Sequence, residues 1–82
     1  MKIKSEQLRD EYRCINIMRA SDESIEDVSI MKEPTGEISL FMSGNDDFYC
    51  NNTVEEMDAL QKRIVKAIEI SKNFDYYFEY YK

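Results

Sequence analysis

Residues 51–72, NNTVEEMDALQKRIVKAIEISK, decide the fold of this chain, because they carry its clearest helical pattern. Thr53 followed three residues later by Glu56 is the capping-box pattern that marks the start of a helix. Acidic residues then occupy the first turns and basic residues follow, which is the order that the helix dipole favours. At about 100° per residue the apolar positions form one stripe, made of Met57, Leu60, Ile64, Ala67 and Ile68. The pattern predicts one long helix whose apolar stripe lies on a sheet.

The residues before this helix contain short runs of alternating hydrophobicity, which are typical of strands. The runs are residues 12–20 (YRCINIMRA), 28–32 (VSIMK), 37–43 (EISLFMS) and, less regular, 47–51 (DFYCN). Pro34 and Gly36 separate the second run from the third, and Gly44 follows the third, so both places read as hairpin turns. In the third run Ile38, Leu40 and Met42 are expected to face the core.

Two further stretches have weaker patterns. Residues 21–27, SDESIED, are polar and are predicted to form a loop. Residues 5–11, SEQLRDE, fit either a short first helix or the lead into the first strand. A chain of 82 residues makes one domain. The sequence therefore predicts a single α+β domain over residues 1–82: a two-layer antiparallel β-meander of three to four strands, packed by one long C-terminal helix.

The last nine residues, FDYYFEYYK (74–82), hold four of the six tyrosines and two of the four phenylalanines. As a strand this stretch alternates, whereas as a continued helix it places one apolar face along the chain end. That face consists of Ile70, Phe74, Tyr77, Phe78 and Tyr81. No glycine or proline precedes residue 74, which favours the helix. The aromatics either close the end of a small core or form a binding surface, for self-association or for another protein, since tyrosine is enriched at interfaces.

Several kinds of catalysis lack their residues in this sequence. Histidine is absent, so a Ser–His or Cys–His pair is excluded. Cys14 and Cys50 are too few for a zinc site, and the chain's two glycines do not make a phosphate-binding loop. We therefore expect neither an enzyme nor a bound cofactor or metal.

The net charge of −6 and the pI near 4.6 argue against direct binding to nucleic acid or to an anionic membrane. They favour a basic protein as partner. The beginning of the sequence, MKIKSEQLRD, lacks the apolar region of a secretory signal. Together with the two cysteines, expected to be free thiols, this predicts a cytoplasmic protein.

The acidic residues are unevenly distributed, and the meander brings two acidic segments together. SDESIED carries four acids, and GNDD, which follows the third predicted strand, carries two. In an up-and-down meander the loops after alternate strands lie at the same end of the sheet. The predicted acidic rim consists of Asp22, Glu23, Glu26, Asp27, Asp46 and Asp47. These residues are either ordinary solvated loops or a phosphate-mimicking rim for a basic groove.

With SDESIED and GNDD as its acidic segments, this small, histidine-free chain resembles the phage-encoded inhibitors of bacterial defence nucleases, such as anti-CRISPR proteins. The resemblance lies in overall character rather than in aligned motifs. It implies a stoichiometric inhibitor, made by a phage or mobile element, that blocks a basic nucleic-acid-binding groove of a host defence protein in the bacterial cytoplasm. The alternative is a small homodimeric accessory or structural protein that associates through its C-terminal aromatic face.

Overall fold

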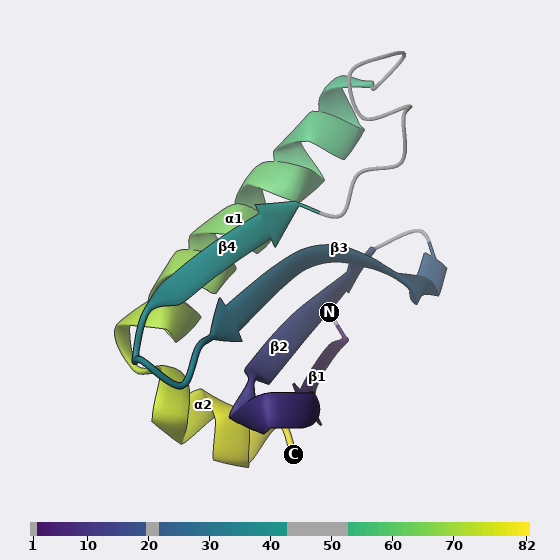
Figure 1. Ribbon diagram of the computed structural model, residues 1–82. Coiled ribbons are helices and arrows are strands. Elements are labelled where there is room, and N and C mark those ends of the chain that lie inside the picture. The colour runs from purple at the N-terminus through teal and green to yellow at the C-terminus, as the bar shows by residue number, and fades with distance from the viewer. Residues whose placement is uncertain (1, 20–21, 43–52) are drawn as a thin grey trace.

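The computed structural model describes residues 2–19, 22–42 and 53–82 and has a four-stranded sheet with two α-helices on one of its faces (Figure 1). The strands follow the chain in the order β1-β2-β3-β4, and each pairs antiparallel with the next. This arrangement confirms the predicted α+β class and the antiparallel sheet, but the strands are not all those predicted, and a long helix and a short one replace the single long C-terminal helix. The elements are β1 (Ile3–Gln7), a 3-10 helix (Arg9–Glu11), β2 (Arg13–Arg19), β3 (Asp22–Lys32), β4 (Ile38–Met42), α1 (Val54–Lys72) and α2 (Phe74–Tyr80).

The core lies between the two central strands and the helices. Ile15 and Ile17 of β2 pair with Ile30 and Val28 of β3, and all four side chains are fully buried. From the helices, Ala67, Ile70, Phe74 and Phe78 pack against them. Burying one such large apolar side chain stabilises a fold by about 1.5–3 kcal/mol. This small set of residues therefore carries most of the packing energy of the domain.

The hairpin between β3 and β4 forms at EPTGE, as the sequence predicts. Gly36 donates its N–H to the carbonyl of Glu33 (2.9 Å), and Glu33 donates its own to the carbonyl of Glu37 (2.9 Å). Gly36 has φ 96°, a left-handed conformation that residues with a Cβ rarely adopt. These bonds define the three-residue loop that ends in a bulge glycine, and they fix the register of β4 on β3.

Helix α1 begins where the capping box predicts. The amide of Glu56 donates to the hydroxyl of Thr53 (3.1 Å), and the amide of Thr53 donates back to the Glu56 carboxylate (3.4 Å). The predicted buried face is wrong, however. Met57 and Ile68 are about half exposed, at 51% and 48%, and Leu60 and Ile64 lie at the margin of the core.

The face of α1 that meets the sheet consists instead of Arg63, Ala67 and Ile70. This face is rotated about the helix axis from the predicted stripe. Arg63 and Ala67 lie toward the sheet in place of Ile64 and Ile68, which follow them in sequence. The apolar pattern missed this face because one of its buried members is an arginine, which hydrophobicity alone assigns to solvent. Of the predicted stripe only Ala67 is fully buried.

The C-terminal aromatic stretch is helical, but it does not continue α1. The chain turns at Asn73 (φ −144°, ψ 55°), and α2 runs below the sheet so that Phe74 and Phe78 enter the core (Figure 1). Asp75 pairs with Arg13 (2.8 Å) and Lys32 (3.1 Å), which are neighbours across β2 and β3. The hydrogen bond from Lys32, and after it the one from Arg13, lowers the pKa of Asp75.

Two other predictions need correction, the first of them in part. Residues 5–11 were predicted to form a short helix or to lead into the first strand; Arg9–Glu11 do form a 3-10 helix, but Ile3–Gln7 before it already form β1, an edge strand of the sheet. SDESIED was expected as a loop, yet β3 starts at Asp22 and runs through it. The strand predicted at residues 47–51 lies outside the described residues. In the described part of the chain, no helix is long and apolar enough to cross a membrane.

Candidate functional site

The first half of β3 presents the described part of the predicted acidic rim. Asp22, Glu23 and Glu26 are exposed along this extended segment, at the end of the sheet where β2 and β4 also end. Asp22 accepts hydrogen bonds from the hydroxyl (2.6 Å) and the amide (3.0 Å) of Ser24, and these bonds lower its pKa. Asp46 and Asp47, the other half of the predicted rim, lie outside the described residues.

Asp27 differs from its acidic neighbours because it is buried, with 6% of its surface exposed. Ile17 pairs with Val28 and Met18 pairs with Glu26, so Asp27 is the extra residue of a β-bulge. Its carboxylate accepts a hydrogen bond from Nε of Arg63 (2.7 Å) and forms an ion pair with Nη2 of the same side chain. The structure therefore places Asp27 against α1 and not on the acidic rim.

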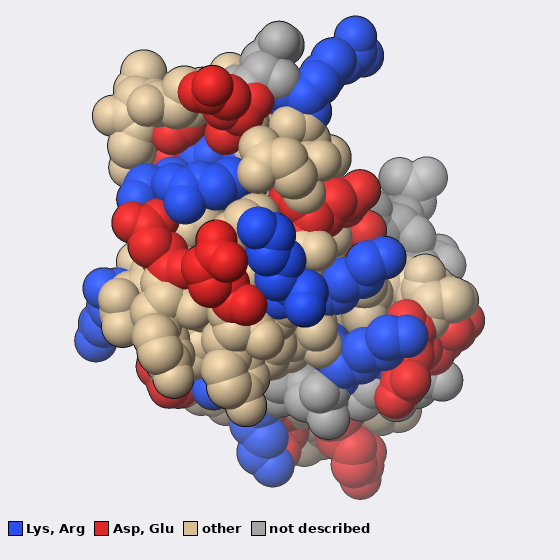
Figure 2. All heavy atoms as spheres, turned by 90° about the horizontal axis from the view of Figure 1, so that it is seen from below, with Lys and Arg blue, Asp and Glu red and all other residues tan. Residues whose placement is uncertain are grey.

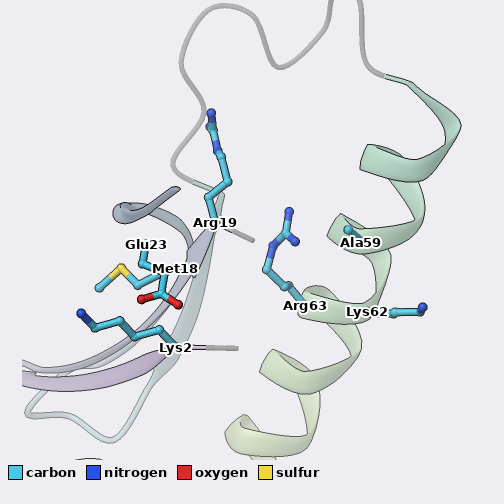
Figure 3. A pocket seen from close by; sticks show the side chains of 7 residues that line it. All are labelled: Lys2, Met18, Arg19, Glu23, Ala59, Lys62 and Arg63. Carbon is cyan, nitrogen blue, oxygen red and sulfur yellow. The ribbon is translucent and has the colours of Figure 1, made fainter. Parts of the chain in front are cut away.

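Arg63 is a buried charged residue that the sequence analysis did not single out. It is 6% exposed and is bound by Asp27, while Arg19 lies 3.8 Å from the other oxygen of the same carboxylate. In Figure 3 Arg63 reaches from α1 toward Arg19 at the end of β2. The sequence contained one signal that Arg63 could be buried: it lies four residues before Ala67 and therefore on the same side of the helix. A buried arginine needs an acid, and SDESIED supplied four.

A cavity of about 250 Å³ lies beside this ion pair, between α1 and the ends of the strands (Figure 3). Arg63 is occupied by Asp27, and Lys62 pairs with Asp58 (3.1 Å) and points away from the sheet. The cavity therefore has a mixed, largely compensated charge rather than a cluster of free cations. It is lined by Lys2, Met18, Arg19, Glu23, Ala59, Lys62 and Arg63.

The predicted aromatic face is largely part of the core. Ile70 is fully buried, and Phe74 and Phe78 are each 3% exposed. Tyr77 and Tyr81 are partly buried against the same cluster. This placement agrees with the interpretation that the aromatic residues close the end of the core. A role in partner binding stays a prediction, and three of the five residues face inward.

The outer side of α2 carries other tyrosines. Tyr76 and Tyr80 are 57% and 67% exposed, and their rings stack with centroids 6.2 Å apart. Tyr77 donates its hydroxyl to Glu69 (2.9 Å), which raises the pKa of the tyrosine. Lys66 lies over the ring of Tyr77, with Nζ 5.4 Å from the centroid. The exposed aromatic area of α2 is therefore a narrow strip beside the predicted face.

Cys14 lies on the face of the sheet opposite the core cluster and is a free, buried thiol. Its Sγ donates to Oδ1 of Asn16 (3.1 Å), and Asn16 in turn donates to Glu6 (3.2 Å). Burial, and then the charges of Glu26 and Glu6, raise the pKa of Cys14 to about 11. The thiol is therefore protonated at neutral pH, which makes it a poor nucleophile.

On the face seen from below, beyond α2, basic and acidic side chains are interspersed (Figure 2). Within residues 2–19, 22–42 and 53–82, no three His, Cys, Asp or Glu side chains are grouped so as to hold a metal ion. Comparisons with protein-family models, with curated proteins and with solved structures found no match to the chain.

Proposed function

We propose that this protein is a stoichiometric inhibitor that binds a basic protein through the acidic first half of β3. The observation that supports this most is the exposure of Asp22, Glu23 and Glu26 on one short extended segment at the end of the sheet. A strand advances about 3.3 Å per residue, so the carboxylates from Asp22 to Glu26 extend over roughly 13 Å at this end of the sheet. Carboxylates concentrated on such a segment form a local anionic field that attracts the basic groove in which another protein holds a nucleic-acid backbone.

The partner that this chemistry fits is a nucleic-acid-binding protein of a bacterial defence system, such as a CRISPR effector. An inhibitor made by a phage or mobile element would meet that partner in the host cytoplasm. A net charge of −6 attracts a basic groove and repels nucleic acid itself. Binding of this kind requires no catalysis.

The experiment is a cleavage assay with a panel of purified, guide-loaded CRISPR nucleases and their target DNA. We expect inhibition of at least one nuclease to be complete near equimolar inhibitor and to weaken in roughly 0.5 M salt, where the Debye length falls to about 4–5 Å. The test variant reverses the three exposed charges to lysine: Asp22→Lys, Glu23→Lys and Glu26→Lys. Inhibition by this variant should be lost while its circular dichroism is unchanged.

A matched control reverses three acids away from this segment, Glu33→Lys, Glu37→Lys and Glu79→Lys, and so gives the same net charge. The control should inhibit nearly as well as the unmodified protein. Equal loss in both variants would show that only the total charge matters. Full inhibition by the test variant, or no inhibition of any nuclease by the unmodified protein, would contradict the proposal.

The alternative, a homodimer formed through the C-terminal aromatic face, has less support. Ile70, Phe74 and Phe78 already pack in the core of their own chain, so they offer no surface to a second copy. Tyr76 and Tyr80 are the most exposed aromatic side chains of this region.

A further inference from the structure

We infer that β4 pairs with β4 of a second copy of this chain, across a two-fold axis at Leu40, to make a dimer with one continuous sheet. This inference is independent of the inhibitor function proposed above. It begins with the difference between the two edges of the sheet. At β1 the strand carries Lys4 and Glu6, and the amide of Ser5 donates to the carbonyl of Tyr81 at the end of α2 (3.2 Å). That edge is charged and partly covered by the protein's own backbone, which discourages further pairing.

The β4 edge has none of these protections within its five residues, ISLFM. It contains no charge and no proline, and no strand of the described residues pairs with its outer side. The exposed fractions of its large side chains are also high for a strand of a small domain. They are 37% for Ile38, 42% for Leu40, 47% for Phe41 and 38% for Met42. An exposed apolar edge of this kind is a template for another strand.

The hairpin bonds show which backbone groups of β4 are free to pair. Glu33 donates to Glu37, so this pair is hydrogen-bonded, and bonded pairs alternate along an antiparallel ladder. Ser39 and Phe41 therefore direct their amides and carbonyls toward β3. Ile38, Leu40 and Met42 direct theirs outward.

The outward groups belong to the same three residues whose side chains lie on the helix face. Leu40 pairs with Ile30, and Met42 pairs with Val28, both of which are core residues. A two-fold axis at Leu40 therefore joins matching partners: Leu40 meets its own copy, and Ile38 meets Met42 in both directions. This register satisfies the outward backbone groups and places apolar side chains together, with no like charges in the seam.

Helix α1 contributes to the same surface. Its Lys66 side contacts Tyr77 of α2, and α2 ends at β1, so the opposite side of α1 faces β4. That opposite side carries Ile64 and Ile68. In the joined sheet the two β3 strands lie three strand spacings apart, about 14 Å. Helices pack at about 8–10 Å, so the apolar sides of both α1 helices and the β4 side chains fill the remaining space.

The area involved suits a dimer. At roughly 150–250 Å² for a large side chain, the exposed fractions given above for β4, with those of Met57 and Ile68, leave on the order of 500 Å² of apolar surface per copy. Two copies would bury about 1,000 Å² of it, to which the paired backbone adds. This reaches the size at which specific interfaces begin.

The first test is the mass of the full chain in solution, measured by sedimentation velocity over a concentration series. We expect a species of twice the 9.8 kDa chain mass that dissociates on dilution. A mass of 9.8 kDa at every concentration up to about 1 mM would overturn the inference.

The second test uses the two-fold axis, which places residue 40 of one copy opposite residue 40 of the other. Leu40→Lys and Leu40→Glu should each halve the observed mass, since each brings like charges together. An equimolar mixture of the two should restore the dimer. The control is Val65→Lys, at a position 59% exposed on the outer side of α1, which should stay dimeric. A monomeric mixture, a dimeric Leu40→Lys variant or a monomeric control would contradict pairing at β4.

A third measurement needs no variant, so it holds even if a substitution unfolds the chain. The amide protons of Ile38, Leu40 and Met42 should exchange slowly in concentrated protein and rapidly on dilution, while those of Ser39 and Phe41 stay protected by β3 at both concentrations. Slow exchange at residues 38, 40 and 42 that does not depend on concentration would assign the edge to another segment of the same chain and overturn the dimer.

Discussion

Asp27 and Arg63 bury opposite charges together, each with 6% of its surface exposed. Removing two charges from water is costly, and their attraction offsets that cost only while both partners are present. The β-bulge in β3 is what turns the Asp27 carboxylate toward Arg63. We therefore expect the pair to fix how α1 sits on the sheet more than to add to the stability of the fold.

We expect Asp27→Asn to lower the free energy of unfolding by about 3–5 kcal/mol, because it leaves the Arg63 charge buried without compensation. The matched control, Asp22→Asn, should change it little because Asp22 is exposed. Replacing both partners, as in Asp27→Leu with Arg63→Met, should recover most of the loss. Urea denaturation measures all three. A loss below about 1 kcal/mol in Asp27→Asn would show that the pair is solvated.

Cys14 gives the protein a pH dependence in the alkaline range. Its pKa is raised from 9.0 to about 11, so between these values the unfolded chain has lost the thiol proton while the folded protein keeps it. Stability from this group is therefore complete below about pH 9 and is lost as pH rises toward 11. Cys14→Ala should remove this component, which the difference between the unfolding free energies of the two proteins measures at each pH. A difference that does not change with pH would contradict the raised pKa.

At the scale of the elements, α1 shows both what the sequence predicts well and what it misses. Its start follows from the local chemistry of Thr53 and Glu56, and the structure confirms it. Its orientation depends on a partner 36 residues away, Asp27, which neutralises the arginine on its buried side. The periodicity of apolar residues contains no information about such a pair. It therefore assigned Met57 and Ile68 to the buried face.

The same reasoning explains the outcome for the other elements. The turn at Gly36 was predictable because its backbone requirement is local. Strand β1 was missed because IKSEQ is polar and is held by contacts distant in sequence: its pairing with β2, the hydrogen bond from Ser5 to Tyr81 and the packing of Ile3 on the core. Of the predicted acidic rim, Asp22, Glu23 and Glu26 are exposed as expected. Asp27 is buried instead, because a β-bulge turns it toward α1. A bulge depends on the pairing with the neighbouring strand, so it cannot be predicted from the composition of the segment.

Two isoleucines on α1 test the corrected orientation. Ile70 is fully buried and Ile68 is 48% exposed, although the sequence pattern assigned Ile68 to the core. We expect Ile70→Ala to destabilise the protein by about 2–5 kcal/mol and Ile68→Ala by less than about 1 kcal/mol. Chemical denaturation in dilute protein, where no dimer contributes, compares them directly. The reverse ranking would restore the predicted stripe.

For the whole molecule, α2 closes the core from below, so the domain should depend on it. A chain that ends at Asn73 loses Phe74 and Phe78, and buried phenylalanines contribute about 3–5 kcal/mol each. Small domains have about 5–15 kcal/mol in all. We therefore expect residues 1–73 to lack a cooperative thermal transition in circular dichroism.

The control keeps α2 but replaces its exposed tyrosines, in Tyr76→Ser with Tyr80→Ser. This variant should melt within a few degrees of the unmodified protein. If residues 1–73 melted cooperatively at the same temperature, α2 would be an appendage and not part of the core.

The gathering of tyrosines in α2 also makes the protein its own optical probe. The chain has no tryptophan, and four of its six tyrosines lie in residues 76–81. Its intrinsic ultraviolet emission therefore reports mainly on α2, and the Tyr77–Glu69 hydrogen bond makes that emission sensitive to the contact between α2 and α1. Far-ultraviolet dichroism reports instead on α1 and the sheet. Because α2 completes the core, the two signals should change together on denaturation, and emission that changed first would show α2 detaching from a sheet that is still folded.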